Sequence, residues 1–354
     1  MRDIFDSTIE RFFLDMVSTE QVLHAEKEGW HEELWGSLDE LGFTLAMAPE
    51  SAGGAGANWT DLCGVARLTG SYSLPLPLLE AIFSNWLLSL CGLDPLTGAL
   101  TFAAKSDLKL IEEKLTGVLQ DVPWGRYAGH ILAIVPEAEQ NHLVVFTSEQ
   151  IESVEQVNNV AGEARDTLVL AQVKPAFSTV LPAQFPANIL QLGGAMIRSA
   201  QIAGALHKAM NISHEYAAER VQFGRPIGSF QAIQHQLAQM AEHVTASVIS
   251  AEAAFSGSPD ALDPLAVCAA KICTSEAAGV GASIAHAVHG AIGFTHEHPL
   301  HLLSRRLWSW RSEFGSETYW AKQLGEAVCK HGYQDFWPAV TAGHFDTFQK
   351  EIRE

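Results

Sequence analysis

The 354-residue sequence has little positive charge: 22 Lys and Arg stand against 41 Asp and Glu, a formal net charge of −19. Nucleic acids and anionic membrane surfaces bind to basic faces, so neither is expected as a partner. Charged residues make up only 18% of the chain, against about 25% in typical soluble domains. Because 47% of the residues are hydrophobic, this composition excludes a disordered chain and favours apolar surface buried between subunits.

The chain also lacks paired cysteines and a segment recognisable as a membrane anchor. Its five cysteines are scattered and include no CxxC pair, which predicts reduced thiols. The N-terminal segment MRDIFDSTIERFF has no apolar core of a signal peptide. The apolar stretch 74–93 is interrupted by two prolines and three polar residues, so it is not expected to span a bilayer. We therefore expect a cytoplasmic protein with no membrane partner.

The common signatures of nucleotide-binding and hydrolytic folds are absent. There is no GxGxxG, GxxxxGK[ST], GxSxG or HExxH motif, and SAGGAGAN (51–58) lacks both the third glycine and a preceding strand. Five histidines gather between positions 286 and 301, but no cysteine or second carboxylate completes a ligand set, so no metal site is expected. A dinucleotide, if present, must be bound outside a Rossmann fold.

The chain is divided into three zones by its residue patterns. Residues 1–95 are predicted to be helical, because Ile9, Phe12, Phe13 and Met16 fall on one stripe. Asn58 or Thr60 can cap a later helix of this zone. Residues 96–185 carry short β-type runs at 130–135, 142–147 and 166–173. This zone predicts a small antiparallel β domain.

Residues 186–354 return to helical patterning with long elements. Apolar residues from Phe230 to Phe255 follow steps of three and four, and Asp263-Pro264 is a good start for the next helix, which continues to about His289. Long helices joined by short connections predict an antiparallel bundle. The predicted fold class is therefore α+β, with a β domain between two helical domains.

One segment points to a ligand. In ERVQFGRPIGSFQAIQHQLAQMA (219–241) a helix ends, a Gly-rich turn follows, and a new helix starts with Ser229 as its expected cap. Arg220 and Arg225 bracket the turn in a chain that is otherwise acidic. Two guanidinium groups at a helix junction suit a diphosphate, because Arg makes bidentate contacts with phosphate oxygens.

This segment resembles the C-terminal domain of the acyl-CoA dehydrogenase family, whose members are FAD enzymes that desaturate acyl-CoA thioesters. APESAGGAGANWTD (48–61) is similar to the family segment PEEYGGxG, and HGAIGFTHEHPLHLLSRR (289–306) is similar to QxxGGxGF. The resemblance spans most of the chain. It implies an acyl-CoA dehydrogenase-like fold with an N-terminal helical domain, a central antiparallel β domain and a C-terminal four-helix bundle.

The resemblance also assigns cofactor-binding positions. It implies that Arg220 and Phe223 contact the flavin dinucleotide across a subunit interface, and that Gln231 lies on the adenine side. Three further positions match two glycines of the glycine-rich segment and a hydroxyl residue near the flavin phosphates: Gly290, Gly293 and Ser316. FAD is therefore the expected cofactor, as the acceptor of the substrate's β-hydride.

The catalytic base of the family is missing from its expected place. The loop that usually reads YEGT reads Glu313-Phe314-Gly315-Ser316, so Phe314 occupies the position of the glutamate. The family's other base position falls near Gly194, where no carboxylate is present. The glutamine of QxxGGxGF and its second glycine are also replaced, by Ala287 and Ala291.

Three interpretations remain open from the sequence. The chain is a self-sufficient dehydrogenase with Glu313 as a displaced base, the base-lacking subunit of a heteromeric enzyme, or a flavin-free scaffold. Short family members that pair with a second homologous subunit are known, notably in steroid side-chain degradation. The resemblance further implies an acyl-CoA substrate, an electron-transfer acceptor protein, and a homo- or hetero-oligomer with another acyl-CoA dehydrogenase homologue. The sequence does not specify the acyl group.

Overall fold

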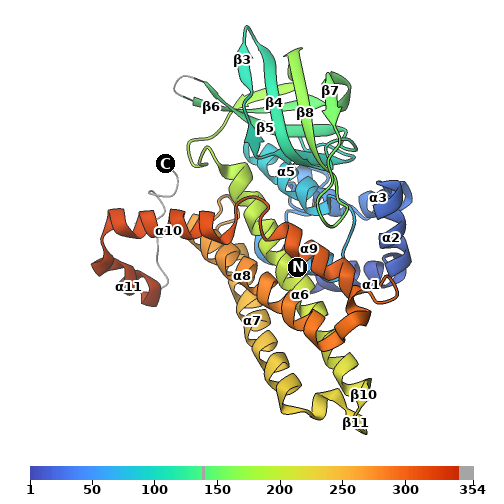
Figure 1. The fold of residues 1–354 in the computed structure, drawn as a ribbon. Helices are drawn as coiled ribbons and strands as arrows, with labels where there is room; N and C mark the ends of the chain where they lie inside the picture. Colours follow the sequence, from blue (N-terminus) through green and yellow to red (C-terminus); the bar gives the residue numbers. More distant parts are fainter. Residues whose placement is uncertain (138–139, 343–354) are drawn as a thin grey trace.

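The computed structural model describes residues 1–137 and 140–342, and it has the predicted order of a helical zone, a β zone and a helical bundle (Figure 1). The first zone contains α1 (Arg2–Met16), α2 (Thr19–Glu28), α3 (Glu32–Glu40), α4 (Trp59–Ser71) and α5 (Leu78–Leu90), with short 3-10 turns η1 (Phe43–Leu45) and η2 (Glu50–Ala52). Of the two candidate caps, Asn58 caps α4: its side chain accepts from the backbone N–H of Asp61, and the Asp61 carboxylate accepts from the backbone N–H of Asn58. Thr60 does not cap this helix, because its hydroxyl donates to the Phe255 carbonyl.

The central zone forms two sheets. Its strands are β1 (Leu100–Ala103), β2 (Lys105–Ser106), β3 (Lys109–Ile111), β4 (Lys114–Pro123), β5 (His130–Glu137), β6 (Gln140–Thr147), β7 (Ser153–Glu155), β8 (Arg165–Val173) and β9 (Phe177–Val180), with the turn η3 (Ser148–Gln150) between β6 and β7. One sheet has the order β1-β5-β6-β9, and the other has β2-β4-β8-β7 with β3 beside β4. The three predicted runs lie in β5, β6 and β8.

One pairing differs from the expected antiparallel domain. β1 pairs with β5 in parallel, whereas the other pairs in these two sheets are antiparallel. Parallel neighbours need a long connection between them, and β2, β3 and β4 supply it by crossing into the second sheet. Along the chain, the β zone otherwise lies between the two helical zones, as predicted.

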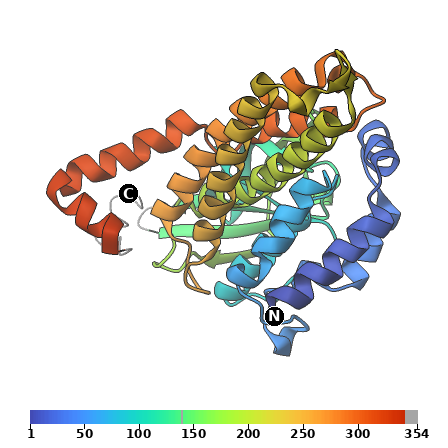
Figure 2. The ribbon, with the colours of Figure 1, turned by 90° about the horizontal axis from the view of Figure 1, so that it is seen from below.

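The third zone is the helical bundle, and Figures 1 and 2 show its long helices lying side by side. Its elements are α6 (Ile189–Glu219), the hairpin β10 (Val221–Gln222) and β11 (Arg225–Pro226), η4 (Ile227–Ser229), α7 (Gln231–Phe255), α8 (Pro264–His289), η5 (Gly290–Phe294), α9 (Leu300–Trp310), α10 (Glu317–His331) and α11 (Tyr333–Ala342). Helices α6 to α9 make up the predicted bundle, while α10 and α11 project away from it.

Two expected helix starts in the bundle had different outcomes. Asp263 caps α8 as predicted, with its carboxylate accepting from the backbone N–H groups of Leu265 and Ala266. Ser229 does not cap α7: its hydroxyl donates to the Pro226 carbonyl, because the η4 turn places it one residue before the helix junction. The first turn of α7 therefore keeps its backbone N–H groups free of any side-chain cap.

Among the residues that the structure describes, one helix is long and apolar enough to cross a membrane by length and composition alone. It is α8 with the following turn, Pro264–Phe294, and the sequence analysis had not singled it out. Most of its residues are buried inside the bundle, where it packs against α6, α7, α9 and α10. The apolar stripe of α7 also packs inside this chain, since Met240, Val244 and Phe255 are buried there.

Candidate active site

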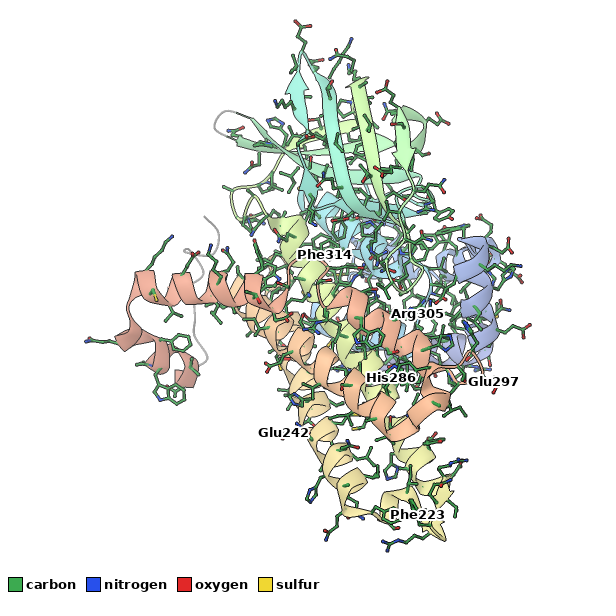
Figure 3. The ribbon with its side chains drawn as sticks, viewed as in Figure 1. Phe223, Glu242, His286, Glu297, Arg305 and Phe314 are labelled. Atoms are coloured by element: carbon green, nitrogen blue, oxygen red, sulfur yellow. The ribbon has the colours of Figure 1, made fainter. Side chains whose placement is uncertain are left out.

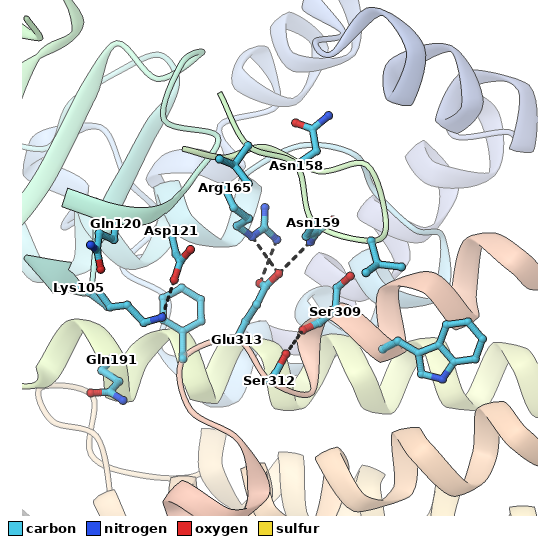
Figure 4. A pocket seen from close by; sticks show the side chains of 15 residues that line it. Lys105, Gln120, Asp121, Asn158, Asn159, Arg165, Gln191, Ser309, Ser312 and Glu313 are labelled. Atoms are coloured by element: carbon cyan, nitrogen blue, oxygen red, sulfur yellow. Dashed lines mark hydrogen bonds and ion pairs between the residues drawn. The ribbon is translucent and has the colours of Figure 1, made fainter. Parts of the chain in front are cut away.

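A cavity of about 510 Å³ lies between the β domain and the bundle (Figure 4). The β domain supplies side chains from β2, β4 and the loop before β8, and the bundle supplies the start of α6 and the end of α9. Polar and aromatic groups among its lining residues include Lys105, Gln120, Asp121, Asn159, Arg165, Gln191, Trp308, Ser312, Glu313 and Phe314. Glu313 and Phe314, the first two residues of the expected catalytic loop, thus reach this cavity.

The phenyl ring of Phe314 fills the place where a catalytic base was expected. Phe314 has a left-handed backbone with φ of +54°, and its ring lies 5.6 Å from the ring of Phe102, centroid to centroid. A methyl group on Gly194 would overlap the Phe314 ring. The two positions that could carry a base are therefore in contact with each other, and neither has a group that accepts a proton.

Glu313 lines the same cavity, but its carboxylate is fully engaged (Figure 4). Arg165 donates to it from Nε and from a terminal nitrogen, at 2.9 and 3.0 Å, and Arg198 Nε donates at 2.7 Å. Asn159 Nδ2 donates at 2.9 Å. Burial alone would raise the pKa of the Glu313 carboxyl, but the two guanidinium charges and their hydrogen bonds lower it to about 2. A carboxylate held in this way is a poor proton acceptor at neutral pH.

These contacts belong to a larger buried ion-pair network that the sequence analysis did not identify. Arg198 also pairs with Glu80 at 2.8 Å, and Arg165 pairs with Glu163 at 2.8 Å. The network joins α5, α6, β8 and the loop after α9. The sequence signal that could have indicated this network is a single charged residue, Arg198, inside the apolar helical stretch GGAMIRSAQIAG. An arginine in such a position is rarely buried unless it is paired.

The expected cofactor residues Arg220, Phe223 and Gln231 lie at the far end of the bundle, where α6 ends, the β10–β11 hairpin follows and α7 begins. We call this end of the bundle, residues 220–231, the tip. Figure 3 shows Phe223 at one end of the bundle and Phe314 near its other end, beside the β domain. Phe223 is 91% exposed and has a φ of +53°, so its ring stands out from the surface. The Arg225 guanidinium lies 4.2 Å from the Phe230 ring centroid. Within the described residues, neither arginine of this tip has a carboxylate partner.

The remaining predicted cofactor residues have separate structural roles. Gly290, with φ of +63°, ends α8 in a conformation that favours glycine, and a methyl group there would meet open space. Gly293 is buried, and a methyl group would come within 3.1–3.2 Å of His289, His286 and Leu300. Ser316 caps α10, accepting from the Tyr319 backbone at 3.3 Å.

The histidine cluster is an aromatic and hydrogen-bonded group. His289 stacks on Tyr216 with centroids 4.6 Å apart, and His286 stacks on Phe294 at 4.2 Å. His286 Nε2 lies 2.9 Å from the Ser304 hydroxyl. In the part of the chain that the structure describes, no group of three His, Cys, Asp or Glu is arranged to hold a metal ion. The stack of His289 on Tyr216 brings the end of α8 beside the last turns of α6, so the end of α8 lies toward the tip.

Helix α6 separates the tip from the cavity. Gly194 stands near its start and Arg220 follows its last residue, 26 positions later. At about 1.5 Å per residue, the helix places these two positions about 40 Å apart. The tip and the cavity of one chain therefore lie well apart.

The order of helical domain, β domain and helical bundle defines the acyl-CoA dehydrogenase fold. The structure of the ChsE4-ChsE5 complex from Mycobacterium tuberculosis matches with a TM-score of 0.84 at 21% identity, over 94% of this chain and 98% of that one. The Tcur3481-Tcur3483 steroid ACAD G363A variant matches with a TM-score of 0.81 at 23% identity, over 92% and 96%. At these identities the likeness shows the fold.

Sequence comparison establishes the family. Residues 192–328 match the model described as acyl-CoA dehydrogenase, C-terminal domain. The chain is 30% identical over 287 residues to acyl-CoA dehydrogenase IpdE2 of Mycobacterium tuberculosis, covering 80% of this chain and 82% of that protein. The protein therefore belongs to the acyl-CoA dehydrogenase family, as the sequence motifs had indicated.

Proposed function

We propose that this chain is the base-lacking subunit of a heteromeric, FAD-dependent acyl-CoA dehydrogenase, whose homologous partner supplies the catalytic glutamate. The observation that carries the proposal is the contact of Phe314 with Gly194. Desaturation of an acyl-CoA requires removal of the proton on the α-carbon by a positioned acceptor. A phenyl ring and a glycine cannot accept it, and the nearby Glu313 is held ionised by two arginines.

The tip fits a flavin dinucleotide that is held mainly by another subunit. Arg220 and Arg225 offer guanidinium groups without carboxylate partners among the described residues, and the start of α7 offers uncapped backbone N–H groups. Phe223 presents an exposed ring beside them, and Gln231 is exposed in the first turn of α7. When bound, the flavin would accept the hydride that leaves the β-carbon.

The relatives support a CoA thioester as substrate and a heteromeric assembly. One structural neighbour is described as a complex of two proteins, ChsE4 and ChsE5, and another as a steroid acyl-CoA dehydrogenase. We accordingly infer a steroid-derived or fatty acyl group. From the sequence and the family resemblance we also propose a cytoplasmic location and an electron-transfer protein as the acceptor of the flavin's electrons.

The test is to purify the chain alone and together with a co-expressed homologue that carries glutamate at the base position, and to record the flavin absorbance of each. The proposal predicts flavin in the pair and its weakened retention when Arg220 in this chain is replaced by Ala. A pair that contains no flavin would favour the scaffold interpretation. A pair that keeps its flavin equally well in the Arg220→Ala variant would remove this tip from the site.

A further inference from the structure

We propose that Arg198 denies this cavity a catalytic base, because its guanidinium would hold as an ion pair any carboxylate placed at position 314 or position 194. This inference rests on the proposed function and goes beyond it. On this account the cavity lacks a base for two reasons: the side chain is missing, and the surrounding charges would keep a restored carboxylate from acting as one.

Both positions lie beside the same guanidinium. The carbon at the centre of the Arg198 guanidinium is 5.4 Å from the Phe314 ring centroid. Gly194 and Arg198 are four residues apart on α6, so their side-chain directions fall on one face of the helix. A methyl group on Gly194 would meet the Phe314 ring. The Arg198 guanidinium therefore lies close to both positions, 314 and 194, from which a base could reach the cavity.

Arg198 is fixed and cannot turn away from this spot. It is 1% exposed, and it donates to Glu313, to Glu80 and to the Gln201 side chain. Three of its five N–H groups are used in these bonds. A buried guanidinium remains charged at all pH values of interest, so its effect on a neighbouring carboxyl group is permanent.

Arg198 would shift the pKa of a neighbouring carboxyl group in the direction opposite to the one that catalysis needs. An opposite charge within about 4–6 Å lowers the pKa of a carboxyl group by about 1 to 3 pH units, whereas a general base works best with a pKa near the operating pH. Glu313 provides the precedent in this cavity: burial would raise its pKa, but Arg165 and Arg198 together lower it.

Other charged groups around Arg198 come from several neighbouring elements. Glu80 lies on α5 and Glu163 just before β8, and Arg165 of β8 shares the Glu313 carboxylate with Arg198. Lys271 on α8 faces both Arg198 and Glu313. Simply adding a carboxylate would unbalance this network, so the test should keep its net charge constant.

The experiment moves the carboxylate by one residue. Glu313→Gln/Phe314→Glu keeps the charge count and creates the family's base position, and Glu313→Gln/Phe314→Gln is the uncharged control. The midpoint of urea unfolding is measured for both variants from pH 6 to pH 8. A captured carboxylate is ionised throughout this range, so the difference between the two midpoints stays constant and neither variant alone turns over acyl-CoA. Phe314→Glu against Phe314→Gln repeats the comparison if the double variants do not fold.

A different result would overturn the inference. A carboxyl group that does not pair with Arg198 in this buried site has a raised pKa, so the folded protein binds more protons than the unfolded protein. The Glu313→Gln/Phe314→Glu variant would then lose stability relative to its control as the pH rises from 6 to 8. That outcome would leave the proposed function intact, because the natural chain would still lack the base.

Discussion

The ring of Phe314 lies against the backbone of Gly194, so the loop after α9 and the first long helix of the bundle meet where a catalytic carboxylate was expected. Glycine at 194 makes room for the ring, and a larger side chain there would collide with it. The contact explains how the fold accommodates a phenyl ring at position 314, where the family resemblance places a carboxylate.

The Glu313 carboxylate is predicted to be a structural group. Replacing it with Gln leaves two buried arginines short of a partner, so Glu313→Gln should lower the free energy of unfolding by about 3 kcal/mol. Urea denaturation at pH 7 measures the loss. The control is Glu317→Gln, which breaks the half-exposed pair with Arg311 and should cost less than about 1 kcal/mol. Equal losses of stability in the two variants would mean that the buried ion pairs of Glu313 stabilise the fold no more than the half-exposed pair of Glu317.

The same carboxylate predicts a dependence of stability on acid. Its pKa is about 2 in the folded chain and near 4.5 in the unfolded chain, so its stabilising contribution is fully present above about pH 4.5. It is lost as the pH falls from about 4.5 toward about 2. Unfolding midpoints of the wild type and Glu313→Gln should therefore converge as the pH is lowered through this range, and a constant gap would contradict the assignment.

Lys271 predicts a second rise of stability with pH, in the neutral to alkaline range. It is fully buried on α8 and donates to Ser275 and to the carbonyls of Trp310 and Arg311. Burial lowers its pKa to about 7, against about 10.5 in the unfolded chain, so the unfolded state binds more protons between these values. Wild-type stability should rise relative to Lys271→Met by about 2 kcal/mol from pH 7 to pH 9. A gap that does not change with pH would show that Lys271 stays charged.

The tip is predicted to act in another subunit's site. Arg220→Ala should weaken flavin binding by the assembled enzyme by about 2 kcal/mol, or about 30-fold in the dissociation constant. Arg11→Ala, which removes an exposed arginine from α1, is the matched control and should leave binding unchanged. Light scattering should show an assembly of at least two chains at micromolar concentration, whereas a lone monomer that binds flavin would contradict the two-subunit site.

Local patterns were enough to predict much of the fold. The cap at Asn58, the start of α8 at Asp263 and three of the strands were recognisable because they depend on neighbouring residues. The parallel pairing of β1 with β5 was not, since it depends on chain segments about 30 residues apart. The Arg165–Glu313–Arg198 cluster was missed for the same reason, as its members lie on three separate elements.

The central claim, that this chain needs a partner to supply the base, is tested most directly by turnover. The purified chain is assayed with straight-chain, branched and steroid-like acyl-CoA substrates and an artificial electron acceptor, alone and with a homologue carrying the glutamate. We predict little or no turnover by the chain alone and clear turnover by the pair. Robust turnover by the chain alone that disappears in Glu313→Gln would make Glu313 the base, and turnover that survives this substitution would place the base elsewhere in this chain; either result would contradict the claim.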